Sequence, residues 1–293
     1  MKKFVLAYNP VSGNNMFKKK LDLLVAMFQA RYCILIPYRT SPQNTDFVEF
    51  IRTIKPCGII IAGGDGTLNE IVNILLKNKI TLPIAILPSG TSNDFASCLT
   101  LNAHTIESYI DSIVNGKTTP VDIGYTGNNY FINVASAGML TCVAHNVDRR
   151  LKSTFGKLAY YLRGIGELPK FRALDMTIGA DGKTERVSAF FVLIVNSSVV
   201  AGLKNVSVNA RLNDGKLDLI LLKQCSIPEL VTFAAETVAG KPACNNRNIA
   251  YIQASSFEIN CSETVQSDID GEPGPKLPLK IETIPAAIDV YIR

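Results

Sequence analysis

Residues 63–70 combine residue types that suit the binding of a phosphate group. The segment reads Gly-Gly-Asp-Gly-Thr-Leu-Asn-Glu. Glycines let the backbone come close to a ligand, and the free N–H groups at the start of a helix attract anions. Asp65, in the middle, would repel a bare phosphate, so it predicts a divalent metal ion between carboxylate and phosphate. Thr67 and Glu70 have the spacing of a capping box, which predicts the start of a helix.

Two further segments suit the same chemistry. Residues 88–94, Pro-Ser-Gly-Thr-Ser-Asn-Asp, form a second phosphate-type turn, and Asp94 in it is a second carboxylate able to hold Mg²⁺. Residues 268–272, Asp-Ile-Asp-Gly-Glu, form an acidic turn that could supply a general base. The P-loop consensus and the dinucleotide motif G-x-G-x-x-G are both absent. Each turn alone is most often just a turn, but together they indicate phosphoryl transfer.

The elements that must position these residues alternate between strand and helix. Residues 58–64 are apolar or small throughout, which predicts a short strand buried on both faces, and the apolar spacing after it is that of one helix face. The other predicted elements are strands at 4–8, 33–37 and 84–87 and helices at 21–31 and 47–54. This alternation predicts a parallel sheet covered on both faces. Because ligands bind such sheets at the carboxyl ends of the strands, we expect loops 9–14, 63–67 and 88–94 to meet in one site.

Beyond about residue 120 the pattern changes to strands separated by turns, with helical segments only at about 138–165 and 226–239. The predicted strands are 121–125, 130–136, 186–196, 217–223, 249–254, 256–261, 276–282 and 287–293. The predicted fold class is therefore α/β plus all-β. An N-terminal doubly wound parallel-sheet nucleotide-binding domain spans 1–122, and a C-terminal β-sandwich-like domain spans 123–293. The sequence leaves open whether the last strand returns to the first domain.

Composition narrows the function classes. The chain has 293 residues, of which 47% are hydrophobic and 19% charged, as in ordinary soluble globular proteins. No apolar run approaches the roughly 18–20 residues needed to cross a bilayer, and the apolar part of the N-terminus is too short for a signal peptide. We therefore expect a cytoplasmic protein. Seven scattered cysteines without a C-x-x-C pair, and two histidines, argue against a disulfide framework, a zinc site or a Ser-His-Asp triad.

The net charge of +5 is unevenly distributed. Residues 149–172 contain seven Lys or Arg and a single acidic residue, Glu167, interleaved with Leu, Ile, Phe and Tyr. Such a stretch binds anionic membrane surfaces or forms a solvated helix face, and the composition alone does not separate these two interpretations. Nucleic-acid binding fits poorly, because the net charge is modest and no recognition module is present.

Four motifs occur in order along the chain: Asn9-Pro10-x-Ser12-Gly13, Gly63-Gly64-Asp65-Gly66-Thr67-x-Asn69-Glu70, Leu87-Pro88-x-Gly90-Thr91-x-Asn93-Asp94-Phe95-Ala96 and Asp270-Gly271-Glu272. In this order and spacing the set resembles the bacterial lipid kinases of the diacylglycerol kinase catalytic-domain family. The Gly-Gly-Asp-Gly element is shared with NAD kinases and phosphofructokinases. The Asn-Asp-Phe-Ala and Asp-Gly-Glu elements narrow the resemblance to lipid kinases.

The resemblance implies a two-domain enzyme that uses ATP to phosphorylate a lipid hydroxyl. It implies that Asp65 and Asp94 organise a catalytic Mg²⁺ and that Glu272 takes the proton of the acceptor hydroxyl. A carboxylate suits this task, because an unactivated alcohol needs a base within hydrogen-bond reach. The implied nucleotide contacts are Asn9, Pro10, Ser12, Gly13, Thr40, Gly63, Gly64, Asp65, Gly66, Thr67, Asn69, Glu70, Thr91 and Asn93.

Members of that family also carry a structural Mg²⁺ in the second domain. Residues 212–218, Leu-Asn-Asp-Gly-Lys-Leu-Asp, match that element. The implied ligands are the Asp214 side chain and the backbone carbonyls of Arg211 and Lys216. Two cations stand here where apolar residues are usual, and a plain Asn-Asp-Gly hairpin turn is the alternative interpretation.

The leading hypothesis is an ATP-dependent lipid kinase of phospholipid biosynthesis that converts diacylglycerol to phosphatidic acid. It would work from the cytoplasm at the inner face of the membrane, docked on anionic lipid through residues 149–172. The alternatives are a kinase for a soluble acceptor such as NAD and a nucleotide-binding protein without catalysis. The sequence decides neither which lipid alcohol is the acceptor nor whether the protein forms a homodimer.

Overall fold

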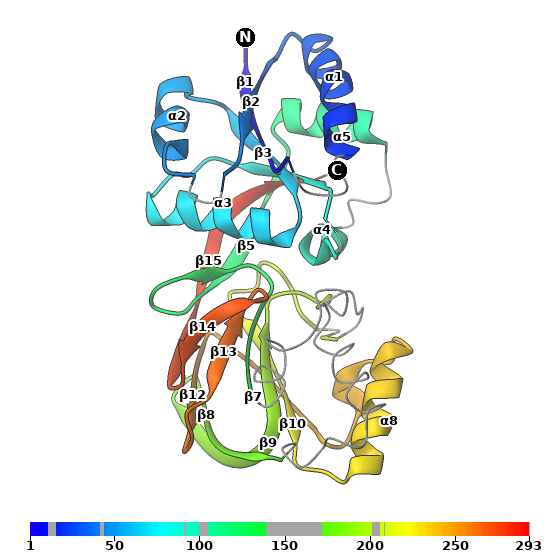
Figure 1. The fold of residues 1–293 in the computed structure, drawn as a ribbon, viewed down its shortest axis with the longest axis vertical. Coiled ribbons are helices and arrows are strands. Elements are labelled where there is room, and N and C mark those ends of the chain that lie inside the picture. Colours follow the sequence, from blue (N-terminus) through cyan, green and yellow to red (C-terminus); the bar gives the residue numbers. More distant parts are fainter. Residues whose placement is uncertain are drawn as a thin grey trace. The chain divides into compact units, whose positions relative to one another are not determined.

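The computed structural model describes residues 1–10, 16–41, 44–90, 92–99, 105–138, 172–200, 206–207 and 209–292 (Figure 1). The chain divides into two compact units: Met1–Val121 together with Ala286–Arg293, and Asp122–Pro285. Strands β5 (Thr118–Tyr125) and β15 (Leu279–Tyr291) each contribute residues to both units. The last residues of the chain, left unassigned by the sequence, thus group with the first unit. The helix expected at 138–165 and nearly all of the basic stretch 149–172 lie outside the described residues.

The first unit alternates strands and helices. Its elements are β1 (Lys3–Tyr8), α1 (Met16–Gln29), β2 (Ile34–Arg39), α2 (Phe47–Ile54), β3 (Gly58–Gly63), α3 (Asp65–Lys77), β4 (Ile84–Pro88), α4 (Asp94–Cys98) and α5 (Ile106–Asn115). The strands form a parallel sheet in the order β15-β4-β3-β1-β2. In Figure 1, α2 and α3 lie on one side of this sheet and α1 and α5 on the other. The predicted parallel sheet covered on both faces is confirmed.

Strand β3 lies at the centre of this sheet, between β1 and β4. All six of its residues are buried, as expected for an apolar run with helices on both faces. Because β1, β3 and β4 are parallel, their carboxyl ends lie at one edge, and the loops that follow them begin there.

The structure corrects the predicted capping box. Helix α3 starts at Asp65 with Gly64 as its N-cap residue, so Thr67 is the third residue of the helix and not its cap. The Thr67 side chain folds over Gly63, where an added Cβ would lie 2.5 Å from the Thr67 Cβ. The hydroxyl of Thr67 and the carboxylate of Glu70 accept hydrogen bonds from other loops instead of from the first turn. Glycine at 63 and 64 lets the helix begin three residues earlier than the S/T-x-x-E spacing suggests.

Two helices, α4 and α5, were not predicted, and the start of a third helix, α1, was predicted too far along the chain. Asp94, interpreted from the sequence as part of a polar turn, begins α4, and α5 follows with Thr105 as its N-cap. Helix α1 begins at Met16, ahead of the predicted start at 21, because the three lysines after Met16 and Phe17 interrupt the apolar periodicity that marks a helix.

The second unit is mostly antiparallel. Its elements are β6 (Tyr130–Phe131), β7 (Val134–Gly138), β8 (Leu174–Ala180), β9 (Lys183–Val195), β10 (Leu217–Lys223), α8 (Ile227–Val238), the short helix η4 (Ala243–Asn245), β11 (Ile249–Ala254), β12 (Ser256–Cys261), β13 (Gln266–Ile269) and β14 (Glu272–Lys276). The strand order is β14-β13-β7-β9-β8-β12-β15, with β10 joining β9 to β11. Strand β8 and the β13–β14 hairpin were not predicted. Among the described residues, no helix is long and apolar enough to span a membrane.

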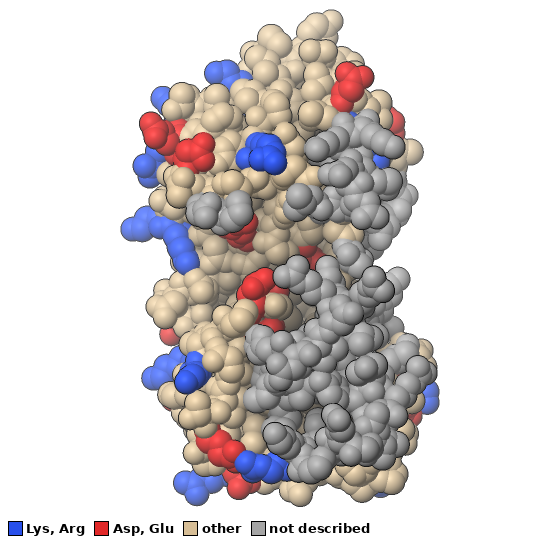
Figure 2. Space-filling model, viewed as in Figure 1, with Lys and Arg blue, Asp and Glu red and all other residues tan. Residues whose placement is uncertain are grey.

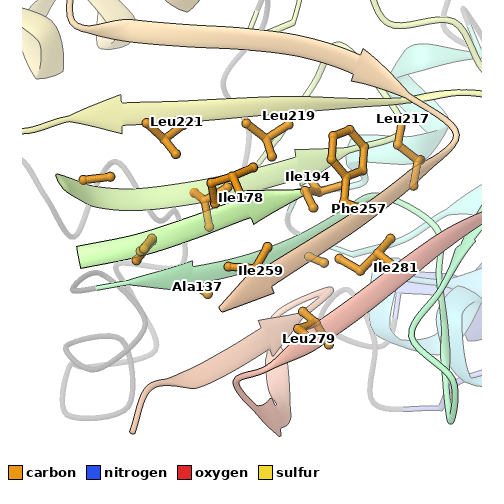
Figure 3. Close-up of a cluster of buried hydrophobic side chains, with 14 of the residues drawn as sticks. Ala137, Ile178, Ile194, Leu217, Leu219, Leu221, Phe257, Ile259, Leu279 and Ile281 are labelled. Carbon is orange, nitrogen blue, oxygen red and sulfur yellow. The ribbon is translucent and has the colours of Figure 1, made fainter. Parts of the chain in front are cut away.

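Residues 189–195 of β9 and residues 217–222 of β10 are buried on both faces. Alternate residues of each strand enter two different apolar clusters. One cluster, drawn in Figure 3, contains Ile194 and Leu219 with residues of β8, β12 and β15. The other contains Leu193 and Ile220 and is covered by α8. This burial on both faces explains why both strands read as continuous apolar runs in the sequence.

Candidate active site

The two glycine-rich turns predicted to bind phosphate lie in direct contact. The Ser89 N–H donates to the Gly63 carbonyl at 3.0 Å. A Cβ added to Gly90 would lie 2.5 Å from the Gly64 Cα, and one added to Gly64 would lie 3.2 Å from the Gly90 Cα. The two backbones can approach this closely only because neither residue has a side chain. The prediction that loops 63–67 and 88–94 meet at the carboxyl edge of the sheet is confirmed.

The two aspartates of these turns are neighbours. The Asp65 carboxylate accepts the N–H groups of Asp94 at 3.2 Å and of Phe95 at 3.4 Å, so it caps the start of α4. Asp94 is buried, with 7% of its surface exposed. Asn93, with φ of 51°, closes the loop through two hydrogen bonds to the backbone of Gly90, each 2.9 Å long. Asn93 therefore shapes the loop around the two aspartates.

The loop after β1 joins the same edge. The Asn9 N–H donates to the Ala62 carbonyl at 3.0 Å, and its side-chain amide donates to the Thr67 hydroxyl at 3.1 Å. The backbone N–H and the hydroxyl of Thr40 both bond the Tyr8 carbonyl, at 3.0 and 3.2 Å. Three residues predicted from separate segments, Asn9, Thr40 and Thr67, are thus brought to one edge. Pro10 follows directly, whereas Ser12, Gly13 and Thr91 lie outside the described residues.

Glu70 ties this edge to the segment after β2. Its carboxylate accepts a hydrogen bond of 2.6 Å from the Asn44 side chain. Burial raises the pKa of Glu70, and the bond from Asn44 opposes that shift. Asn69, one residue earlier, bonds the side chain of Asn73 along the helix. A Cβ added to Gly66 would meet no atom of the described residues within 4 Å.

The Asp-Gly-Glu motif forms a tight turn between β13 and β14 in the second unit. The Asp270 carboxylate accepts three backbone N–H groups, from Ile132 at 2.7 Å, Asn133 at 3.0 Å and Val134 at 2.8 Å. Asp270 and Gly271 both have positive φ, 50° and 88°, and so reverse the chain. Glu272 follows as the exposed first residue of β14. Asp270 therefore fixes the turn that precedes Glu272.

The turn proposed for a structural metal is held by a different aspartate. The Gly215 N–H donates to the Asp122 carboxylate at 2.6 Å, and Asp122 is 2% exposed. Asp214 is exposed, and its carboxylate accepts the Lys216 N–H at 3.1 Å. The turn does not join two strands of a hairpin, since residues 206–207 and 209–211 before it form no strand. The described residues contain no group of three or more His, Cys, Asp or Glu side chains that could hold a metal.

Comparisons with known proteins cover nearly the whole chain. Residues 3–126 match the family described as the diacylglycerol kinase catalytic domain, and residues 133–292 match the YegS C-terminal NAD kinase beta sandwich-like domain. The diacylglycerol kinase of Bacillus subtilis (strain 168) is 36% identical over 282 residues, 95% of this chain and 92% of that protein. The chain belongs to the diacylglycerol kinase family.

Other members of the family agree with this assignment. The diacylglycerol kinase of Staphylococcus haemolyticus (strain JCSC1435) is 35% identical over 288 residues, 97% of this chain and 86% of that protein. A crystal structure of a diacylglycerol kinase candidate from Bacillus anthracis strain Sterne superposes with a TM-score of 0.82 at 26% identity, covering 100% of this chain and 95% of that one. These matches confirm the predicted fold class, including the β-sandwich-like second half, and they support kinase chemistry.

A diacylglycerol kinase family member is expected to use a divalent metal, and the described residues fit one at Asp65 and Asp94. Mg²⁺ takes one or two protein carboxylates and completes its shell with water and substrate phosphates, so a pair of aspartates suffices. Each oxygen of the Asp65 carboxylate accepts one long N–H bond and keeps lone-pair capacity for a second partner. Asp214 offers a single carboxylate in its own turn, and a metal there stays a prediction.

In this family member, sequence reasoning missed the residues that hold the site in shape. Asp122 was interpreted only as part of a strand at the domain boundary, and Asp270 only as part of an acidic turn. Asn44 and Asn196 were not singled out at all. Asp122 and Asn196 are buried polar residues within or next to strands. A polar residue at such a place in the sequence is a signal that could have identified both of them.

Proposed function

We propose that this protein transfers the γ-phosphate of ATP to the hydroxyl of a lipid alcohol, with diacylglycerol as acceptor and phosphatidic acid as product. The observation that carries the proposal is the contact between the turns after β3 and β4, which brings Asp65 and Asp94 together at the carboxyl edge of the parallel sheet. Open parallel sheets bind nucleotides at this edge, and phosphoryl transfer needs positioned carboxylates to hold its metal. The family's named activity supports the choice of acceptor.

Each residue of the proposed site has its own role. Gly64, Gly66 and Asn9 present backbone and amide groups to the phosphates, and Asp65 with Asp94 would hold Mg²⁺. The metal, when bound, neutralises the negative charge of the phosphates. Glu272 accepts the proton of the acceptor hydroxyl, which makes the oxygen a better nucleophile.

Residues 149–172 are the proposed contact with the membrane. The described Lys and Arg side chains lie scattered over the face shown in Figure 2 and form no single basic patch there. The basic residues of the stretch would attract an anionic leaflet, each by about 1 kcal/mol, while the interleaved apolar residues enter the interface. Co-sedimentation with vesicles of anionic phospholipid, compared with neutral vesicles, tests this assignment. Equal binding to both would contradict it.

The function is tested with purified protein, Mg²⁺, labelled ATP and diacylglycerol in mixed micelles. Labelled phosphatidic acid is the expected product. Glu272→Gln should lower turnover by roughly 10²–10⁴-fold, the usual contribution of a general base, and leave ATP binding nearly unchanged. Glu282→Gln, at another exposed glutamate of the same unit, is the matched control and should behave as wild type. Wild-type turnover by Glu272→Gln would contradict the base assignment.

A soluble acceptor is the second candidate. The match of residues 133–292 to an NAD kinase-like domain favours it. An acceptor panel that contains NAD but no lipid separates the two functions, because only the second candidate predicts a labelled product there. Binding of ATP without turnover on any acceptor would instead indicate a nucleotide-binding protein without catalysis.

A further inference from the structure

Asn196 lies at the centre of a buried polar network in the second unit. It directly follows β9 and is 1% exposed. Its side-chain amide donates to two backbone carbonyls, of Asp122 at 2.7 Å and of Ile132 at 3.0 Å. Its own backbone N–H donates to the Asn133 carbonyl at 2.9 Å. One residue thus makes three hydrogen bonds to two segments more than sixty positions away in the sequence.

The segment that Asn196 holds is the one that fixes the Asp270–Glu272 turn. Residues 132–134 face two ways: the carbonyls of Ile132 and Asn133 accept bonds from Asn196, while the N–H groups of all three donate to the Asp270 carboxylate. The backbone of residues 132–134 therefore links Asn196 to Asp270 and is hydrogen-bonded to both. Asp270 in turn is two residues from Glu272, through a turn in which Asp270 and Gly271 both have positive φ.

The polar network around Asn196 lowers the stability of the core at two positions. Asn196 and Asn133 each bury a side-chain oxygen that has no hydrogen-bond partner among the described residues. An unsatisfied buried acceptor lowers stability, whereas an apolar residue of similar size at position 196 would remove that acceptor but leave the Asp122 and Ile132 carbonyls without this donor. Polar groups kept at such a cost point to a requirement for geometry, which the two N–H groups of the Asn196 amide supply by fixing two carbonyls at once.

We propose that Asn196 is a positioning residue for Glu272. By clamping residues 132–134 it holds the Asp270 carboxylate in place, and through Asp270 it sets the direction in which Glu272 leaves the turn. The proposal rests on the proposed function in one respect, that Glu272 is the base of the reaction. The clamp itself is a property of the fold and can be measured without any turnover.

The test compares Asn196→Ala with Thr237→Ala in the full-length protein. Thr237 is 2% exposed in α8 and its hydroxyl donates to the Phe233 carbonyl, so loss of this hydroxyl lowers stability away from the turn. Asn196→Ala should speed amide hydrogen exchange at residues 132–134 beyond its effect on the rest of the unit. It should also lower kcat by about 10- to 100-fold, as supporting residues of a reactive group do, with KM for ATP within about twofold of wild type. The control should change neither local exchange at 132–134 nor kcat.

The possible results distinguish the role of Asn196 in holding residues 132–134 from the proposed kinase activity. Unchanged exchange at residues 132–134 in Asn196→Ala overturns the clamp, and faster exchange with a wild-type kcat overturns the positioning of Glu272. A wild-type protein that phosphorylates no acceptor overturns the proposed function, and the role of Asn196 in catalysis with it, while exchange still reports the clamp. If Asn196→Ala does not fold, Asn196→Ser, which keeps one donor at this position, is judged by the same measurements.

Discussion

Replacing Gly90 with alanine tests the close packing of the two glycine-rich turns. The new Cβ would lie 2.5 Å from the Gly64 Cα, 3.3 Å from the Gly64 nitrogen and 3.0 Å from the Asn93 Oδ1. The nearest obstacle is backbone, which cannot rotate away as a flexible side chain could, so the two turns must separate. Overpacking of this kind costs about 1–3 kcal/mol of stability.

That loss converts into a measurable change in melting temperature. For a domain the size of the first unit, each kcal/mol is worth roughly 3–5 °C, so Gly90→Ala should lower the melting temperature by roughly 3 to 15 °C in calorimetry. Separating the turns also moves Asp94 away from Asp65, so ATP binding in the presence of Mg²⁺ should weaken. A melting temperature within about 1 °C of wild type would refute the close contact, because the smallest expected overpacking cost exceeds that change.

Gly66→Ala is the matched control for this experiment. Its Cβ would meet no described atom within 4 Å, and the residue is already helical. Alanine in a helix is favoured over glycine by roughly 0.5–1 kcal/mol, so this variant should keep or gain stability. If the Gly66 backbone approaches the phosphates of ATP, the added methyl group should nevertheless weaken ATP binding. The pair thus separates a glycine needed for packing from one needed for a ligand.

Three further predictions concern the second unit. Burial raises the pKa of Asp218, against the bond from Tyr251. The protonated carboxyl group of Asp218 therefore stabilises the folded state below about pH 4, and this stabilisation is lost as the pH rises through the raised pKa. Asp218→Asn should show a weaker pH dependence in urea unfolding above pH 4, and equal slopes would contradict this. Hydrogen bonds from Ser226 lower the pKa of Glu229 to about 2, so stability from this group is lost as the pH falls from about 4.5 toward 2. Ser226→Ala should shrink that acid sensitivity in thermal melts, and an undiminished one would argue against the cap. Asp270→Ala removes the acceptor of three N–H groups, so kcat should fall by roughly 10²-fold at unchanged ATP affinity in titration calorimetry. Wild-type turnover would show that the turn does not need Asp270.

From the sequence alone one can predict the parallel sheet of the first unit and the loops that meet at its edge. The apolar run 58–64 predicts a strand buried on both faces, and the glycines after it predict a turn into a helix, because both signals are local. The rule that parallel strands place their following loops at one edge then brings loops 9–14, 63–67 and 88–94 together without any structure. The described parts of all three loops do meet there.

The folded chain is needed to see which side chains hold these loops in place. The partners of Thr67 and Glu70 are Asn9 and Asn44, from distant loops, although the local spacing suggested a cap. Strand β14, Glu-Pro-Gly-Pro-Lys, has little strand propensity of its own and forms because β13 lies beside it.

The same holds for the network around the proposed base. The links from Asp122 to Gly215 and from Asn196 through Ile132 to Asp270 join segments far apart in the chain. A hydrogen bond between distant segments leaves no periodic signal in the sequence, because it depends on where the chain has already folded. The sequence could therefore name Asp65, Asp94 and Glu272, but only the folded chain shows what fixes their positions.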